Sequence, residues 1–201
     1  MFIKTSGFKR LIASAYNGSG LHVANDGEGL ILHGLMWSMW IRSGHLPKKS
    51  LGDLIALTGE LPERNRAFVA TKKEFQWEAI AAYPDNAMKM AESCNAEMDP
   101  TRVLMVSTTF VRLLQNDEAG LMAIDEAFYR LIDAGAVEEG EDTPEGPIVK
   151  LSEGHGFNYD VGVCWKNDDM AISFRYGETN QVEKEMALLE GHHIARTSEI
   201  I

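Results

Sequence analysis

Three residues near the C-terminal end of the chain have the types that a nucleophilic enzyme uses. His155, Asp160 and Cys164 lie close together in the segment EGHGFNYDVGVCW. A cysteine becomes a catalytic nucleophile when a histidine and an orienting carboxylate converge on it. Cys164, however, lies in an apolar stretch that alternates like a strand, where a cysteine usually acts as a small hydrophobic residue. We therefore assign no catalytic residue.

Other signatures of enzymes and metal proteins are absent from the sequence. It contains no GxxxxGK[ST] phosphate loop, no GxSxG nucleophile motif and no HExxH metal helix. None of the six histidines pairs with a cysteine or a carboxylate at a recurring metal-ligand spacing. We expect no cofactor and no metal ion, and an enzyme of unrecognised class stays an alternative.

The segment LMWSMWI, residues 35–41, carries a tryptophan on each face if it is a strand. Trp37 then points to one face, and Met36 and Trp40 point to the other. Either the strand is central and covered on both faces, or its second face is exposed and closes a homodimer or docks a host protein. Tryptophan, methionine and arginine are enriched at the centres of protein interfaces. We assign partner binding to Met36, Trp40, Arg42, Lys48, Lys49, Arg64 and Arg66.

Charge is distributed unevenly along the chain, whose net charge is −11. Residues 1–73 contain ten lysines and arginines against five acidic residues, whereas residues 74–201 are strongly acidic. An acidic body repels nucleic acid, but a basic segment attracts its phosphates. The segment EEGEDTPE predicts an acidic surface formed by Glu138, Glu139, Glu141, Asp142 and Glu145.

The basic first third of the chain favours nucleic-acid binding as an alternative function. The segment SLGDLIALTGELPERNRAF resembles a helix-turn-helix, with Arg64 and Arg66 in its basic second part. In another arrangement, Trp37 or Trp40 stacks on bases beside the basic residues that follow the strand. Salt distinguishes such binding from an apolar interface, because phosphate contacts weaken steeply as salt rises.

Hydrophobic periodicity predicts helices over residues 5–17, 50–59, 85–96, 118–134 and 181–190. Strands are expected at residues 21–25, 29–34, 35–41, 67–71 and 101–107, and in the segments PIVKL, DVGVCW and MAISFRY. Helices and strands mix without strict alternation, which predicts an α+β fold: a mostly antiparallel sheet in two meanders with about five helices. We expect one domain over residues 1–201, with subdomains 1–98 and 99–201, meeting at an Asp99-Pro100 turn, as an alternative.

The sequence also bears on the compartment. Cys94 and Cys164 are the only cysteines and belong to no motif, so we expect reduced thiols in a cytoplasmic protein. The N-terminal segment has neither the apolar core nor the cleavage site of a signal peptide. No run of about 18 apolar residues is present, so we expect no membrane contact.

Three stretches carry a resemblance to a known group: FIKTSGFKRLIASAYNGSGLHV, LPKKSLGDLIALTGELPE and MDPTRVLMVS. They are similar to uncharacterised small proteins of phages and mobile elements of gut bacteria. The resemblance implies a mobile-element origin, in a bacterial or phage-infected host cell, and no site residues. Proteins of this origin and size often block host machinery by binding, and acidic ones imitate nucleic acid. The leading hypothesis is therefore a non-enzymatic interaction protein that inhibits a host nuclease or CRISPR effector through its acidic surface or the Trp/Met strand.

Overall fold

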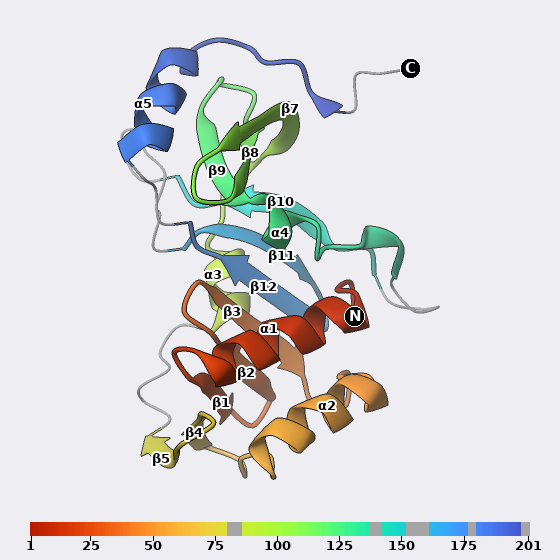
Figure 1. Ribbon diagram of the computed structural model, residues 1–201. Coiled ribbons are helices and arrows are strands. Elements are labelled where there is room, and N and C mark those ends of the chain that lie inside the picture. The colour runs from red at the N-terminus through yellow and green to blue at the C-terminus, as the bar shows by residue number, and fades with distance from the viewer. Residues whose placement is uncertain (80–85, 137–141, 152–160, 177–179, 198–201) are drawn as a thin grey trace.

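A nine-stranded antiparallel sheet forms the centre of the molecule, and a separate three-stranded sheet lies beside it (Figure 1). The computed structural model describes residues 1–79, 86–136, 142–151, 161–176 and 180–197. Within these residues, five α-helices pack on the two sheets. The expected α+β class with mostly antiparallel pairing is therefore confirmed.

The large sheet joins strands from both ends of the chain. In spatial order its strands are β5 (Phe75–Ala79), β4 (Arg66–Ala70), β1 (Leu21–Asn25), β2 (Gly29–His33), β3 (Trp37–Arg42), β12 (Met170–Phe174), β11 (Val163–Asn167), β10 (Glu145–Val149) and β6 (Ala96–Glu97). β3 pairs with β12, so that Trp40 lies opposite Ala171. The strands expected in two meanders are therefore continuous with each other, and strands from both sides of residue 98 share one sheet.

Helices cover both faces of the large sheet. α1 (Thr5–Asn17) and α2 (Lys48–Thr58) pack on one face, and α3 (Ala87–Glu92) packs on the other (Figure 1). α1 confirms the helix predicted over residues 5–17. Its largest buried side chains follow the helical period that predicted it: Phe8, Leu11 and Ile12.

These layers explain why β3 carries two tryptophans. Trp37 and Trp40 are each 6% exposed, because the first lies in the core on the α1 side and the second in the core beneath α3. The indole N–H of Trp40 donates a hydrogen bond to a carboxylate oxygen of Asp26 over 3.1 Å. β3 is therefore a central strand covered on both faces, and the hypothesis that Trp40 offers an exposed face to a partner is wrong.

The smaller sheet has packing partners on both of its faces, although part of β7 and the start of β8 stay exposed. It consists of β7 (Asp99–Val106), β8 (Phe110–Gln115) and β9 (Leu121–Asp125). Leu113 packs against α5 (Asn180–Leu189) on one face. Leu114, the next residue, joins the main core on the other face. The smaller sheet is therefore a layer between α5 and the rest of the molecule.

The helix predicted over residues 118–134 is wrong in its first part. Leu121–Asp125 forms β9, and only α4 (Glu126–Tyr129) is α-helical, followed by a short 3₁₀ helix at Ala134–Ala136. The first four residues of β9 are all buried, so the strand lacks the polar alternation that would have marked it. Asp125 then begins α4, because its carboxylate accepts a hydrogen bond from the N–H of Ala127 over 2.7 Å.

Three shorter predictions also need correction. α3 ends at Glu92 rather than at residue 96, because Ala96–Glu97 pairs with β10 as the edge strand β6. The segment after α2 forms the strand β4, so no second helix follows and the helix-turn-helix interpretation is wrong. Asp99 and Pro100 lie within β7 rather than in a turn, although the pairing with β8 is irregular beside them. None of the described helices is both long and apolar enough to cross a membrane.

Candidate partner-binding groove

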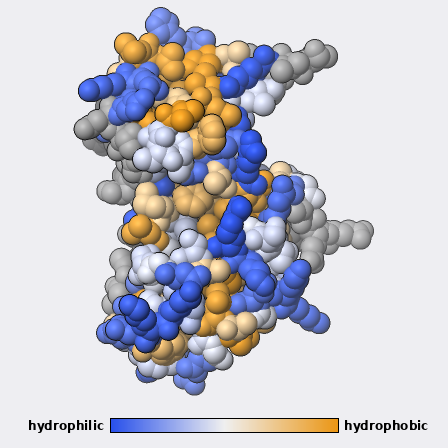
Figure 2. Space-filling view, viewed as in Figure 1, coloured by the Kyte–Doolittle hydropathy of each residue, from blue (hydrophilic) through white to orange (hydrophobic). Residues whose placement is uncertain are grey.

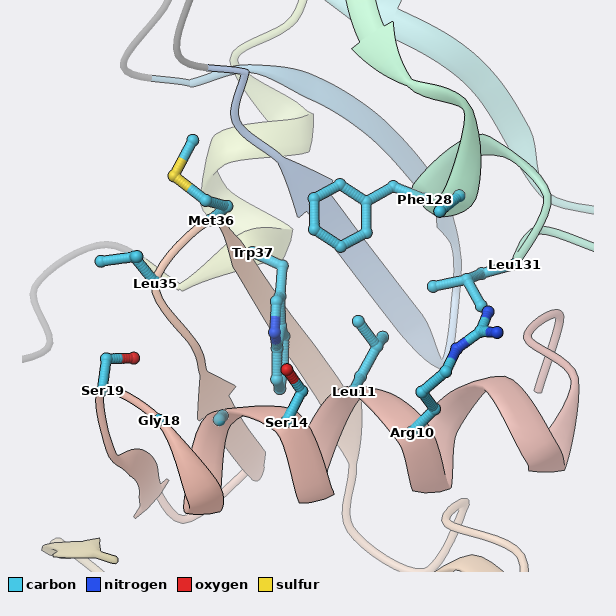
Figure 3. A pocket seen from close by; sticks show the side chains of 12 residues that line it. Arg10, Leu11, Ser14, Gly18, Ser19, Leu35, Met36, Trp37, Phe128 and Leu131 are labelled. Atoms are coloured by element: carbon cyan, nitrogen blue, oxygen red, sulfur yellow. The ribbon is translucent and has the colours of Figure 1, made fainter. Parts of the chain in front are cut away.

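The candidate site begins as a hollow between α1, the start of β3 and α4 (Figure 3). The hollow has a volume of about 400 Å³. Figure 3 shows Phe128 and Leu131 reaching toward α1 from the opposite wall. Its apolar side chains are Leu11, Leu35, Met36, Trp37, Phe128 and Leu131. Apolar walls and this volume are typical of a binding site.

A second hollow, of about 590 Å³, continues the first toward the β7–β8 hairpin. Its hairpin wall is formed by Leu104, Thr109 and Phe110. Arg10 and Ala127 line both hollows, so the two adjoin at these residues. We call the two hollows together the α1–α4 groove.

The sequence of α1 and of the turn before β3 creates the first wall. Leu11 is buried and its neighbour Arg10 is exposed, because adjacent residues of a helix point in different directions. Gly34 precedes β3 and donates its N–H to the carbonyl of Trp37 over 3.0 Å. A Cβ atom at residue 34 would lie 2.3 Å from the indole nitrogen of Trp37, so only glycine lets the indole fold back against the turn.

A buried ion pair anchors α4, which forms the opposite wall. Glu126 accepts hydrogen bonds from Arg112, at 2.6 Å to Nε and 2.9 Å to Nη2, and from Arg130 Nε at 2.7 Å. The hydrogen bonds from Arg112 and Arg130 lower the pKa of Glu126, although burial opposes the shift. Phe128 also stacks on Phe174 of β12, with 4.8 Å between the ring centroids. These contacts fasten α4 to β8 and β12, so this wall of the groove is held in place without a ligand.

Exposed apolar side chains lie in and beside the two hollows of the groove. Leu35 is 73% exposed at the end of the first hollow, and Phe110 is 62% exposed beside the second. Val106 and Leu104 of β7 are also exposed. Figure 2 shows hydrophobic residues gathered over the three-stranded sheet. Contiguous exposed apolar surface of this kind typically marks an interaction site.

The polar groups of the groove are suited to binding rather than to proton transfer. Arg10 lies where the hollows adjoin, and among the described residues it forms no ion pair. Two acidic residues line the second hollow with it, but Asp125 caps α4 and Glu126 is paired with Arg112 and Arg130. Arg130, the other cation, is already paired with Glu126. Ser14 and Ser19 add hydroxyl groups to the first hollow. Across the described residues, no cluster of three or more histidine, cysteine or acidic side chains is placed to hold a metal ion.

The structure divides the predicted partner-binding residues between two sides of the sheet. Met36 lines the groove, and its role in partner binding stays a prediction. Trp40 and Arg42 instead border a polar hollow of about 620 Å³ on the α3 side. Arg42 pairs there with Asp169, at 2.9 Å from Nε to the carboxylate. The Trp/Met strand therefore contributes Met36 and Trp37, not Trp40, to the groove.

The remaining predicted basic residues lie on other elements. Lys48 and Lys49 are exposed at the start of α2. Arg64 lies over the β1–β2 turn, close to Gly27, and Arg66 begins β4. The structure does not bring these four side chains into the groove.

The structure describes only two of the five residues of the predicted acidic surface, Asp142 and Glu145. Glu138, Glu139 and Glu141 lie outside the described residues. Asp142 is exposed, and Glu145 pairs with Lys166 at 3.3 Å. His155 and Asp160 also lie outside the described residues, so their convergence on Cys164 stays untested.

Sequence reasoning missed the residues that complete the groove. Arg10 is one of several cations on the solvent side of α1, and nothing local distinguishes it. Phe128 and Leu131 fall in the helix predicted over residues 118–134, which gives them no role at a surface. Phe110 belongs to β8, a strand that the pattern did not predict. The clearest available signal in the sequence was the apolar pair Leu35-Met36 directly after Gly34.

A second surface lies at the edge of the large sheet, on β4 and β5. Phe75 and Trp77 are each 42% exposed, and their ring centroids lie 5.6 Å apart. The guanidinium of Arg66 lies over Trp77, 5.0 Å from the ring centroid. Glu78 points to the opposite face, where it pairs with His22 at 3.6 Å. We call Arg66, Phe75 and Trp77 the β5 aromatic surface.

No family model matches this chain, and no curated protein matches it either. The function therefore has to be inferred from the two surfaces. In the described part of the chain, neither surface holds a histidine or an acid placed as a general base beside a nucleophile, whereas both offer exposed apolar side chains next to a cation.

Proposed function

We propose that this protein is a non-enzymatic interaction protein whose α1–α4 groove binds a segment of a partner protein. The segment places apolar side chains in the two hollows and an acidic side chain opposite Arg10. The observation that carries this proposal is a guanidinium without an acidic partner among the described residues, at the junction of two apolar hollows. A carboxylate matches the planar donor geometry of arginine.

The groove has the properties of an interface centre. Arginine is among the residues that dominate binding energy at interfaces when apolar neighbours exclude water from them. Leu35 and Phe110 are exposed in the free protein, so a bound segment would remove both from water. The anchored position of α4 lowers the entropic cost of binding, because the walls do not have to be ordered first.

The partner class that we propose is a host protein that processes nucleic acid, such as a nuclease or a CRISPR effector. The net charge of −11 supports this class, because an acidic body is attracted to the basic surface with which such proteins bind phosphates. The groove would then supply short-range contacts, and the charge would accelerate the encounter. The phage or mobile-element origin belongs to the same proposal.

The experiment is a selection from a displayed library of random peptides, followed by affinity measurements on the selected peptides. We expect enriched peptides to share an acidic residue flanked by apolar residues. Leu35→Asp, in the groove, should weaken their binding by about tenfold or more, which corresponds to ~1.4 kcal/mol. Arg10→Glu should weaken it similarly, and less so for peptides whose acidic residue is replaced by its amide.

Matched variants outside the groove serve as controls. Leu188 of α5 is 78% exposed, close to the 73% of Leu35, so Leu188→Asp makes the same change elsewhere. Lys48→Glu matches the charge reversal at Arg10. Equal weakening by the groove variants and their controls would refute the proposal. A homodimer that Leu35→Asp dissociates, seen by light scattering without peptide, would refute it in favour of a second copy as the occupant.

Nucleic-acid binding is a second candidate function, and the β5 aromatic surface supports it. Exposed aromatic rings stack on unpaired bases, and a neighbouring guanidinium meets the phosphates. Trp77→Ala should weaken binding of a labelled single-stranded oligonucleotide by ~1–3 kcal/mol. The control is Gln76→Ala, on the opposite face of the same strand. Binding that is insensitive to salt, or equally reduced by both variants, would exclude this function.

A further inference from the structure

The two cysteines of the chain meet on the α3 side of the large sheet. Cys164 lies in β11, where its register partner is Ile148 of β10. Cys94 follows α3, which packs against β11 and β12. The next residue, Asn95, donates its N–H to the carbonyl of Val149 over 3.0 Å. Cys94 is thereby held over the part of the sheet that contains Cys164, and its side chain packs against the buried cluster to which Cys164 belongs.

The two thiols have different surroundings. Cys164 is fully buried among apolar side chains, whereas Cys94 is half-buried and lines an open hollow of about 240 Å³. The hydrogen bond with Cys164 lowers the pKa of the Cys94 thiol, and Lys150 and Lys166 act in the same direction, although burial opposes the shift. The hydrogen bond with Cys94, together with burial, raises the pKa of Cys164 well above its usual value.

This asymmetry matches the two roles in disulfide formation. The first thiol must reach the oxidant and must ionise, because the thiolate is the nucleophile. The second thiol only has to lie close to the first, and burial protects it from direct oxidation. Cys94 meets the first requirement and Cys164 meets the second.

We propose that Cys94 and Cys164 form an intramolecular disulfide when the protein encounters a hydroperoxide, with Cys94 attacking and Cys164 resolving. A pair of this kind makes the protein responsive to oxidants and links the end of α3 to β11. The proposal does not depend on the function proposed for the groove.

The reaction balances with hydrogen peroxide as the oxidant. The Cys94 thiolate attacks one peroxide oxygen, the O–O bond breaks, and Cys94 becomes a sulfenic acid. The hydroxide that leaves takes up the proton lost from Cys94 and forms water. The Cys164 thiol then attacks the sulfur of Cys94, and the S–S bond forms as the second water leaves. Two thiols lose two electrons and two protons in total, and one peroxide becomes two waters.

The experiment treats the reduced full chain with one equivalent of hydrogen peroxide and follows free thiols, intact mass and peptide maps under non-reducing conditions. We expect both thiols to disappear together, with the mass loss of two hydrogens and one linked peptide pair. In Cys164→Ala the reaction should stop at the sulfenic acid of Cys94. Dimedone should label this acid about tenfold more than in the unmodified chain.

Cys94→Ser provides a test that does not alter the buried position. Its remaining thiol, on Cys164, should resist peroxide in the folded protein and become reactive in urea. The proposal is overturned if Cys94 oxidises to the sulfinic acid while Cys164 stays free, or if only disulfides between chains form. It is also overturned if Cys164 reacts equally fast with and without Cys94.

Discussion

The buried ion pair beneath α4 gives the sharpest prediction of stability. Glu126→Gln keeps the shape of the side chain but removes its charge, which leaves Arg112 with a neutral partner. The side chains of Arg112 and Glu126 are only 14% and 8% exposed, so solvent cannot replace the lost interaction. Breaking such a pair on one side typically costs about 3–5 kcal/mol. Because glutamine retains one acceptor oxygen for Arg112, we expect a loss of about 3 kcal/mol.

Urea unfolding followed by circular dichroism at pH 7 would measure this loss. The slope of the transition should stay the same, because the variant exposes the same surface on unfolding. Lys4→Gln is the matched control, since Lys4 pairs with Asp133 at 3.8 Å and their side chains are 55% and 37% exposed. An exposed pair contributes about 0–1 kcal/mol. A loss below about 1 kcal/mol for Glu126→Gln would show that the α4 pair is no stronger than a surface pair.

The same variant tests how Glu126 makes the stability of the protein depend on pH. The pKa of Glu126 is lowered in the folded protein from its ordinary value of 4.5. A lowered carboxylate pKa stabilises the fold above the unfolded-state pKa, and this stabilisation is lost as pH falls through the folded-state pKa. The stabilities of the unmodified chain and of Glu126→Gln should therefore converge below about pH 4.5. If the two proteins differ in stability by the same amount at every pH, the pKa of Glu126 is not lowered in the folded protein.

Two further predictions concern the large sheet. Trp40→Ala should lower the free energy of unfolding by about 3–5 kcal/mol, because it leaves a cavity beneath α3. Trp40→Phe should lower it by about 1–2 kcal/mol, because only the hydrogen bond to Asp26 is lost. Equal losses for the two variants in urea unfolding would contradict the packing described. Burial, aided by the charges of His22 and Arg175, lowers the pKa of His33 to about 4. Below pH 6.5 the unfolded chain therefore binds a proton that the folded protein does not. The free energy of unfolding should fall by about 2 kcal/mol between pH 7.5 and 5. His33→Gln should remove that part of the acid sensitivity.

The sequence predicted an element correctly where a clear period or a turn signal marked it. α1 shows the period-3.6 stripe, and its bounds match the prediction. The strands expected at residues 21–25 and 29–34 form the β1–β2 hairpin, and the Asp26-Gly27 pair between them is a strong hairpin signal. The prediction failed for β9 because its short run of buried apolar residues fits a helix as well as a strand, and periodicity alone does not separate the two.

The groove and the thiol pair were harder to predict for a different reason. Met36 was chosen for its residue type and lies in the groove, but Arg10 and Phe128 come together only through the packing of α4 against α1. Cys94 and Cys164 belong to no motif, and their contact depends on α3 crossing β11. Local patterns carry no information about such long-range contacts.

The pairing of β3 with β12 has a consequence for how the chain folds during its synthesis. β3 ends at Arg42, and its neighbour β12 begins only at Met170. A ribosome that adds about 5–20 residues per second needs roughly 10 s to make the intervening chain. During that time β3 has an unpaired edge, and edges of this kind recruit other strands. Nascent chains should therefore depend on chaperones more than the finished protein does, and truncation before Met170 should give insoluble fragments.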